Sequence, residues 1–318
     1  MHLVESGKVH LVGAGPGDPT LLTRKAEQLI RSADIIFYDR LVNPFILQLA
    51  KPEIEIIDVG KRPYQKHIQQ TEINEQIILA AQRYSCVVRL KGGDPAIFGR
   101  VQEEAVALSE QGIPFEIVPG ITSASAAAAK MGIGLTARNV AKAITFTTAS
   151  HCKGQVEALD LHSLMHGGTL AIYMGIKRLP QIVKQIYQET KIDFPIAIFY
   201  NVSTYHEQMI SGHLTTIIKQ VEEQDLGMTP GVIIIGKVME MTNEMSRNID
   251  NMKRKNYLIS GKRSLAIEKA FELYAAGHYC LIKIDSQQPY HKSQFKLYEQ
   301  QEKDLEFDEH IFTDNYQV

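Results

Sequence analysis

The stretch that decides the fold is Arg89-Leu90-Lys91-Gly92-Gly93-Asp94-Pro95-Ala96-Ile97-Phe98-Gly99-Arg100. The apolar run before it, at residues 86–88, predicts a buried strand, and residues 101–111 predict a helix after it. In an open α/β sheet, ligands bind where a parallel strand gives way to the next helix. Gly92 and Gly93 carry no Cβ, so the backbone there can bend freely and approach a ligand closely. The stretch therefore predicts a ligand-binding edge, although a glycine turn without a ligand has the same pattern.

Apolar runs alternate with helical patterns on both sides of this stretch. Strands are expected at residues 9–12, 35–38, 54–59 and 115–118, and again at 143–148, 169–173, 195–199 and 231–237. Such alternation predicts an α/β fold with two lobes, each a mixed, mainly parallel sheet flanked by helices. We expect the lobes at residues 1–120 and 121–242, with an antiparallel hairpin near residues 207–212.

The last part of the chain, residues 243–318, is expected to be a linker and a short C-terminal α/β extension. Met, Asn, Lys and Arg accumulate over residues 240–263, which predicts the linker. One helix at residues 264–276 and one strand at 279–284 follow, and then a charged stretch at 299–309. This is too little to bury a core of its own. The extension could pack on the second lobe, mediate assembly or be the remnant of a larger fused domain.

Composition excludes several classes of protein. With 318 residues, 44% of them apolar, the chain can bury a sizeable core, and a net charge of −2 gives no reason to expect nucleic acid. Cys86, Cys152 and Cys280 lie far apart, which argues against a disulfide framework or a zinc site and suits a reducing cytoplasm. The N-terminus lacks the pattern of a signal peptide, and no run approaches the roughly 20 apolar residues of a membrane span. We expect a soluble cytoplasmic protein.

The loop at residues 13–19 invites comparison with the G-x-G-x-x-G pattern of dinucleotide-binding proteins. Asp18 stands where the third glycine should be, and Pro16 removes an amide donor. An acid at this place would repel a pyrophosphate, so the loop favours a ligand without phosphate. A nicotinamide oxidoreductase remains an alternative that only this glycine-rich turn supports.

Two further expected strands end in charged residues. Asp39 and Arg40 follow residues 35–38, and Lys61 and Arg62 follow residues 54–59. Since the carboxyl ends of parallel strands share one edge, these groups should converge with the two glycine-rich loops on one cleft.

Together these motifs resemble those of the tetrapyrrole methylases, over about residues 9–238. The motifs are Val12-Gly13-Ala14-Gly15-Pro16-Gly17-Asp18-Pro19, Tyr38-Asp39-Arg40-Leu41-Val42, Gly60-Lys61-Arg62, residues 89–100 and residues 119–124. The first is shared by the whole class, including methylases of later corrin intermediates. The second and third point to the branch that acts on uroporphyrinogen III.

The resemblance implies a two-lobed class III methyltransferase that forms a homodimer. It would transfer methyl groups from S-adenosylmethionine to C2 and C7 of uroporphyrinogen III, without a metal, leaving S-adenosylhomocysteine. The product, precorrin-2, leads to sirohaem and the corrinoids. A methylase of a later corrin intermediate and a non-catalytic tetrapyrrole carrier remain alternatives.

The resemblance also assigns residues. The cofactor site would comprise Pro16, Gly92, Gly93, Asp94, Ile97, Thr122, Ser123, Met174 and Ser203. Ser203 replaces a glycine that is usual in the family, so its Cβ could crowd the cofactor. The proton acceptor falls on Asp39 and the proton donor on Lys61, for which pairing with a propionate is an equal alternative.

The substrate that the resemblance implies carries eight carboxylates, so its site needs cations. Arginine is favoured because its guanidinium binds a carboxylate through two hydrogen bonds. The candidate substrate-binding residues are Arg40, Arg62, Arg100 and Arg138. His162 and His166 are spaced as metal ligands on a helix, but no acid lies between them and no metal site is expected.

Overall fold

The computed structural model describes residues 6–60, 69–149, 158–224, 226, 229–241, 254–284 and 289–313. Contacts divide the chain into two units, Met1–Thr122 together with Arg254–Val318, and Ser123–Lys253. The extension thus shares a unit with the N-terminal residues, whereas the three-part division at residues 120 and 242 stays a prediction. No helix within the described ranges has both the length and the hydropathy of a membrane span.

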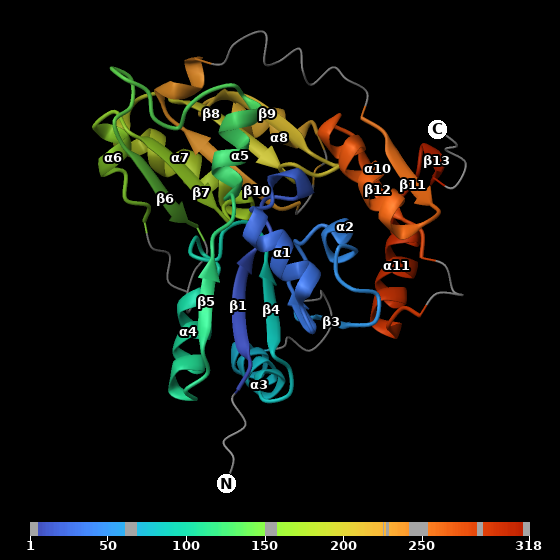
Figure 1. The fold of residues 1–318 in the computed structure, drawn as a ribbon. Helices are drawn as coiled ribbons and strands as arrows, with labels where there is room; N and C mark the ends of the chain where they lie inside the picture. The colour runs from blue at the N-terminus through green and yellow to red at the C-terminus, as the bar shows by residue number, and fades with distance from the viewer. Residues whose placement is uncertain are drawn as a thin grey trace. The chain divides into compact units, whose positions relative to one another are not determined.

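The first unit is built on a five-stranded sheet (Figure 1). Its strands are β1 (Lys8–Gly13), β2 (Ile35–Tyr38), β3 (Glu55–Asp58), β4 (Cys86–Lys91) and β5 (Phe115–Val118), in the order β3-β2-β4-β1-β5. Every pairing in this sheet is parallel. Strands of a parallel sheet are covered on both faces, which is why they are almost continuously apolar. Their carboxyl ends share one edge, where the sequence places its glycine-rich and charged motifs.

Helices connect these strands. They are η1 (Pro19–Leu21), α1 (Arg24–Ser32), α2 (Pro44–Leu47), α3 (Gln70–Ala81) and α4 (Val101–Glu110). Ile77 of α3 and Leu108 of α4 pack against Leu11 and Val87 in the core of the unit. Helix α1 begins at Arg24, because Thr23 caps it by accepting the N–H of Ala26.

The second unit contains a sheet of different topology. Its strands are β6 (Ile144–Thr148), β7 (Thr169–Tyr173), β8 (Pro195–Tyr200), β9 (Gln208–His213) and β10 (Gly231–Ile235), in the order β6-β7-β10-β8-β9. The α/β class and the hairpin near residues 207–212 are confirmed. The expectation of a mainly parallel sheet is wrong here, because three of the four pairings among the described strands are antiparallel and only β6 and β7 are parallel.

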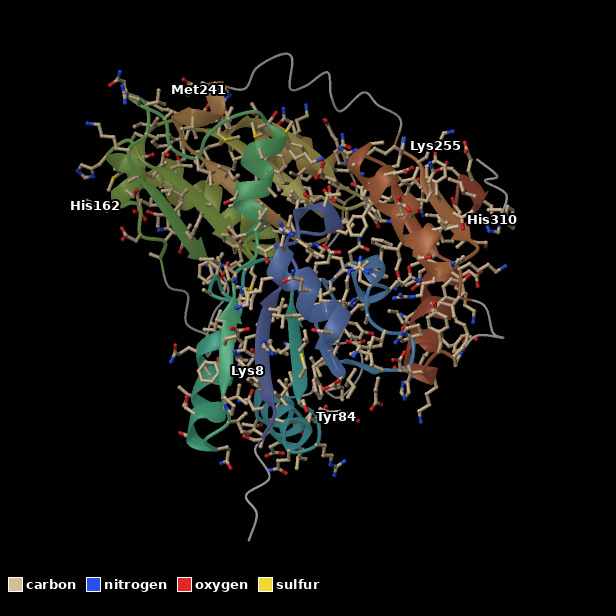
Figure 2. The ribbon with its side chains drawn as sticks, in the orientation of Figure 1. Lys8, Tyr84, His162, Met241, Lys255 and His310 are labelled. Carbon is tan, nitrogen blue, oxygen red and sulfur yellow. The ribbon has the colours of Figure 1, made fainter. Side chains whose placement is uncertain are left out.

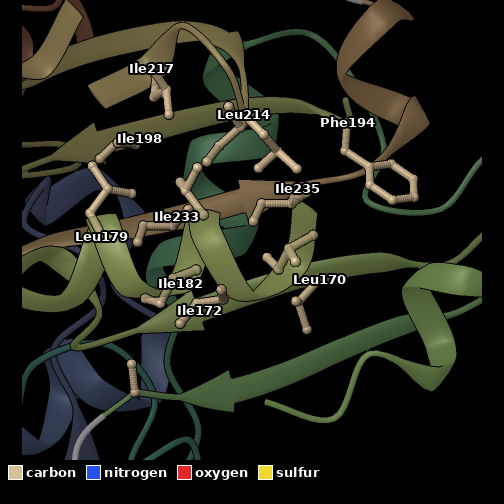
Figure 3. Packing of buried hydrophobic residues seen from close by; sticks show 14 of the residues in the cluster. Leu170, Ile172, Leu179, Ile182, Phe194, Ile198, Leu214, Ile217, Ile233 and Ile235 are labelled. Atoms are coloured by element: carbon tan, nitrogen blue, oxygen red, sulfur yellow. The ribbon is translucent and has the colours of Figure 1, made fainter. Parts of the chain in front are cut away.

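An apolar core holds the second unit together. Its helices are α5 (Ser123–Lys130), α6 (His162–Met165), η2 (Ile176–Arg178), α7 (Leu179–Thr190), α8 (Ile217–Glu222) and η3 (Lys237–Met241). Ile172 of β7, Ile198 of β8 and Ile233 of β10 are fully buried in the cluster that also contains Leu179 and Ile182 of α7 (Figure 3). Because β7 and β8 are both antiparallel to β10, they run parallel to each other, and their carboxyl ends share an edge.

The extension forms a three-stranded parallel sheet with two helices. Its elements are β11 (Asn256–Ser260), α10 (Arg263–Ala275), β12 (Tyr279–Ile282), α11 (Lys292–Asp304) and β13 (Glu309–Phe312), with strand order β12-β11-β13. His310 lies on β13 (Figure 2). Its Nε2 lies 2.7 Å from the hydroxyl oxygen of Ser260 at the end of β11. The expected linker at residues 240–263 is therefore wrong over Asn256–Ser260. The helix and strand within the expected charged tail were not predicted.

The extension packs against the segment after α2 in the first unit. Gln48 donates from Nε2 to the carbonyl oxygen of Ile282 at 2.6 Å, and its Oε1 accepts the N–H of Ile282 at 2.9 Å. The Nε2 of Gln294 lies within 3.0 Å of the carbonyl oxygens of Lys51, Pro52 and Ile54. The sequence left three alternatives open for the extension, and packing on the first unit, which these contacts show, was not among them.

Asn43 connects this interface to the loop after β1. Its Oδ1 caps α2 by accepting the N–H of Phe45 at 2.9 Å. Its Nδ2 donates to the carbonyl oxygen of Gly17 at 2.7 Å and to the hydroxyl of Tyr274 on α10 at 3.1 Å. Tyr274 in turn donates to the carbonyl oxygen of Cys280 at 3.1 Å.

Candidate functional site

Two glycines fasten the loop after β1 to the loop after β4. The N–H of Gly93 donates to the carbonyl oxygen of Gly15 at 2.7 Å. In return, the N–H of Gly15 donates to the carbonyl oxygen of Gly93 at 3.2 Å. Both residues have positive φ, +70° at Gly15 and +71° at Gly93, a conformation that strains any residue with a side chain. The two glycine-rich motifs of the sequence therefore meet at this reciprocal pair.

The loop after β5 closes against the same glycines. A Cβ on Gly120 would lie 2.3 Å from the carbonyl oxygen of Gly93, and a Cβ on Gly13 would lie 2.7 Å from the Cα of Gly120. The ends of β1, β4 and β5 therefore meet backbone to backbone. We call residues 13–15, 92–93 and 120 the glycine cradle.

Asp94 ties two sides of the glycine cradle together. Its Oδ1 accepts the N–H of Ala96 at 2.7 Å, and its Oδ2 accepts the N–H of Gly120 at 3.0 Å. The carboxylate predicted to contact the cofactor thus also organises the loops. The other predicted cofactor-binding residues of this unit, Pro16, Ile97 and Thr122, are half-buried around it.

Asp39 and Arg40 lie beside the cradle. The N–H of Asp39 donates to the carbonyl oxygen of Leu90 at 3.1 Å, which continues the pairing of β2 with β4 beyond the end of β2. A Cβ on Gly92 would lie 3.0 Å from the Cβ of Leu41, so the two loops are in contact. The Asp39 side chain is 31% exposed, and Arg40 is exposed. The structure thus brings the predicted proton acceptor next to the predicted cofactor loop.

The predicted proton donor Lys61 and the predicted substrate-binding Arg62 lie outside the described residues. Gly60, which precedes them, packs against the loop after β2, since a Cβ on it would lie 2.7 Å from the backbone nitrogen of Arg40. Its N–H donates to Oδ1 of Asp58 at 2.9 Å.

A group of buried charges, which the sequence analysis did not single out, lies behind Asp39. Arg89 is 2% exposed, Lys91 3% and Glu104 1%. Arg89 donates from one terminal nitrogen to Oδ1 of Asp39 at 2.6 Å and from Nε to Oε1 of Glu104 at 3.1 Å. Lys91 donates to both oxygens of Glu104, at 2.8 and 2.9 Å. We call Arg89, Lys91 and Glu104 the buried network.

The sequence holds a signal for this network. Arg89 and Lys91 alternate in an otherwise apolar strand, and an acid stands in the first turn of the next helix. Charged residues are almost never fully buried unless they are paired. Two cations on one face of a buried strand therefore require a carboxylate nearby.

The surroundings shift the pKa values of both cations. Burial works against the charge of Arg89, but the carboxylates of Asp39 and Glu104 outweigh it and raise the pKa of the guanidinium. Burial and then the like charge of Arg89 lower the pKa of Lys91, in spite of Glu104. With Asp39, the four groups comprise two cations and two carboxylates.

Arg100, a predicted substrate-binding residue, is exposed at the start of α4. Its guanidinium donates to both oxygens of Glu103, at 2.7 and 2.6 Å. This hydrogen bonding lowers the pKa of Glu103. Arg100 is thus already engaged by a surface carboxylate.

The second unit carries the remaining predicted residues. Met174 follows β7 with φ of +54° and is 53% exposed, and Ser203 follows β8 with φ of +61° and is 2% exposed. The N–H of Ser203 donates to Glu207, and its hydroxyl oxygen has no hydrogen-bond partner among the described residues. Ser123 begins α5, and Arg138 is exposed. Ser203 thus adopts the backbone conformation that glycine favours.

Metal-ligating side chains do not gather in the part of the chain that the structure describes. No group of three or more His, Cys, Asp or Glu residues there could hold a metal ion. His162 and His166 stack on each other, with ring centroids 4.2 Å apart.

Comparison with known proteins agrees with the motifs. The family model of Tetrapyrrole (Corrin/Porphyrin) Methylases matches residues 8–218. The uroporphyrinogen-III C-methyltransferase of Priestia megaterium is 44% identical over 238 residues, which cover 74% of this chain and 100% of that protein. The siroheme synthase of Pseudomonas fluorescens is 39% identical over 77% of this chain, and the match spans about half of that relative, 53%.

A solved structure has the same fold over the matched region. It is a uroporphyrin-III C-methyl transferase from Thermus thermophilus complexed with S-adenyl homocysteine, with a TM-score of 0.63 and 35% identity. The match covers 74% of this chain and 100% of that one. A quarter of this chain thus lies outside the match.

Proposed function

The chain belongs to the tetrapyrrole methylases, and on that premise we propose that it methylates uroporphyrinogen III at C2 and C7 with S-adenosylmethionine, giving precorrin-2. The observation that carries the proposal is the contact of the glycine cradle with the loop that holds Asp39 and Arg40. A site for a small cofactor and a site for an acid that can accept a proton are thereby adjacent. The full-length match to the Priestia megaterium enzyme supports this substrate.

The residues present fit S-adenosylmethionine. The cradle lets a ligand approach the backbone closely, because a Cβ at Gly13 or Gly120 would collide with the chain. In the second unit, the buried hydroxyl of Ser203 has a free hydrogen-bonding capacity among the described residues, and Met174 offers an exposed apolar side chain. When bound, the cofactor supplies a methyl group on a sulfonium, so that a carbon–carbon bond forms as the carbon–sulfur bond breaks and S-adenosylhomocysteine leaves.

The residues of the chain orient the reactants and remove a proton. Orientation alone can contribute about 7–11 kcal/mol to lowering a barrier of this kind. The macrocycle must lose one proton for each methyl group that it gains, and Asp39 is placed to accept it. Arg40 and Arg62 bind substrate carboxylates, and Lys61 either donates a proton or pairs with a propionate. Arg100 and Arg138 contribute further cations for a polyanionic ring.

Incubation of the purified protein with S-adenosylmethionine and uroporphyrinogen III under reducing conditions tests the proposal. We expect a product that carries two added methyl groups and is heavier by two CH2 units, together with two equivalents of S-adenosylhomocysteine. Methylation of a later corrin intermediate, without any of uroporphyrinogen III, would instead assign the chain to another branch of the family.

Two other readings predict different binding and turnover. A nicotinamide oxidoreductase would bind NADH and not S-adenosylhomocysteine in calorimetry. A tetrapyrrole carrier would bind the macrocycle without turnover, and Asp39→Ala would change nothing measurable. We expect Asp39→Ala to keep binding and to lower methyl transfer by about 10²-fold or more, the usual contribution of a general base.

The family resemblance and the cysteine usage extend the proposal to assembly and location. We propose a homodimer in the cytoplasm, without nucleic-acid or membrane partners. Sedimentation of the full chain at micromolar concentration tests the homodimer, which a mass near 36 kDa would contradict, since one chain is 35.7 kDa.

A further inference from the structure

Arg89 joins a buried carboxylate to an accessible one. One terminal nitrogen lies 2.6 Å from Oδ1 of Asp39, and Nε lies 3.1 Å from Oε1 of Glu104. Glu104 is 1% exposed, whereas the Asp39 side chain is 31% exposed. The guanidinium thus reaches from the core of the unit to the edge of the sheet where the candidate site lies.

The buried network fixes the guanidinium in one orientation. Lys91 holds both oxygens of Glu104, at 2.8 and 2.9 Å, and Gln70 donates to Oε1 at 3.3 Å. The other terminal nitrogen of Arg89 donates to the carbonyl oxygen of Leu90 at 3.1 Å. Since the planar fork of arginine is rigid, these partners also set the direction of the hydrogen bond to Asp39.

Asp39 is held at two points as a result. Its N–H donates to Leu90, and its Oδ1 accepts from Arg89. No described residue contacts Oδ2, so that oxygen is the one that can meet a substrate proton. A general base must be held within hydrogen-bond reach of the proton that it accepts, and free rotation of the carboxylate would lose this geometry.

We infer that Arg89 is a positioning residue for Asp39, anchored from behind by Glu104 and Lys91. The inference rests on the proposed function, in which Asp39 accepts the proton. Stability alone is a weak reason for such a network, because buried ion pairs can often be replaced by apolar residues at no cost. The titratable groups packed around Asp39 come from its own loop, from β3 and β4 and from α4; they are Arg40, Asp58, Arg89, Lys91 and Glu104.

A double-mutant cycle between positions 89 and 39 tests the inference. Arg89→Gln should lower kcat at least tenfold, with the KM for S-adenosylmethionine changed less than twofold. In the Asp39→Asn background, the same change should lower kcat less than twofold, because a residue that acts through Asp39 has nothing left to position.

Two further variants make the test independent of folding. Arg89→Lys keeps a buried cation without the fork, and it should lower kcat by a similar factor only when Asp39 is present. Arg31→Gln removes a surface arginine paired with Glu27 in the same unit and should leave kcat unchanged.

The outcomes separate this inference from the proposed function. Wild-type protein that fails to methylate uroporphyrinogen III overturns the proposed function and, with it, the inference. Active wild-type protein whose Arg89 variants lose equal activity with and without Asp39 overturns the inference alone.

Discussion

The two units shape the loops at their sheet edges in different ways. In the first, glycines occupy positions where a Cβ would come within 2.7 Å of the neighbouring chain, at Gly13, Gly60 and Gly120. In the second, the loops after β7 and β8 place Met174 and Ser203 at positive φ, where a side chain costs roughly 1–2 kcal/mol. At the first sheet edge, Gly15 and Gly93 meet the requirement for positive φ, although Phe98 and Arg100 later in the loop after β4 also have positive φ. At the second sheet edge, Met174 and Ser203 meet it without a glycine.

The interiors differ as well. The first unit buries Arg89, Lys91 and Glu104 near its sheet edge, whereas the buried polar residues among those described in the second unit are the uncharged Thr169 and Ser203. A unit with buried charges loses folding stability when one member of an ion pair is removed. A unit with an apolar interior loses stability when a buried side chain is shortened and leaves a cavity. The predictions below test this contrast.

The largest effect is expected at Glu104. Glu104→Leu leaves Arg89 and Lys91 buried without their shared carboxylate, so the free energy of unfolding should fall by about 3–5 kcal/mol. Chemical denaturation followed by circular dichroism measures it. Glu103→Leu is the matched control, one residue earlier and exposed, and its loss should stay within about 1 kcal/mol. Equal losses in the two variants would contradict the role of the network.

A comparison of alanine variants at Gly120 and Gly112 distinguishes the effect of steric crowding from the effect of backbone strain. Gly120→Ala places a Cβ 2.3 Å from the carbonyl oxygen of Gly93, so unfolding should become easier by about 1–3 kcal/mol and binding of S-adenosylhomocysteine should weaken. Gly112→Ala meets no atom within 4 Å but forces alanine to φ of +63°, and it should cost about 1–2 kcal/mol with binding unchanged. Calorimetry and chemical denaturation measure both quantities. Normal binding in Gly120→Ala would argue against a tightly closed cradle.

A smaller gain is expected in the second unit. Ser203→Gly relieves the positive φ and removes a buried hydroxyl without a described partner, so the free energy of unfolding should rise by about 1 kcal/mol. Ser203→Ala removes the hydroxyl and keeps the strained backbone, so it should be less stable than the glycine variant. Thermal unfolding ranks the two, and the reverse order would show that the packing of the loop does not strain the backbone.

The smallest effect concerns a surface cluster of the first unit. Hydrogen bonds from Lys25, His10 and Lys8 lower the pKa of Glu116 to about 2. A carboxylate with a depressed pKa stabilises the fold above its unfolded pKa and loses that contribution as the pH falls toward 2. Wild-type protein should therefore lose more thermal stability between pH 5 and pH 3 than Glu116→Gln. Parallel losses in the two proteins would show that this cluster contributes nothing.

Much of the first unit could be predicted from the sequence. Glycines, Asp94 and the Asp39-Arg40 pair stand at the ends of apolar runs, and parallel topology brings such ends together. The family resemblance then assigned their roles. The buried network was missed because charged residues within a motif were taken as part of a ligand site, and burial of Glu104 depends on how α4 packs.

The second sheet and the extension were harder to predict. An apolar run carries no information on strand direction, so the antiparallel pairings of β10 could not be predicted from its composition. Strand β11 has only three apolar residues, Tyr257, Leu258 and Ile259, and the sequence around them is polar, so the strand pattern is too short to be recognised. Helix α11 is largely polar and is stabilised by contacts such as those of Gln294 with the segment after α2.

The hydrogen bonds of Asn43 link the extension to the loop after β1, which forms part of the candidate site. The side-chain amide of Asn43 caps α2, donates to the loop that contains Gly17 and donates to the hydroxyl of Tyr274 at 3.1 Å. A replacement at this single position therefore disturbs three segments at once, one of them more than 200 residues away in the chain.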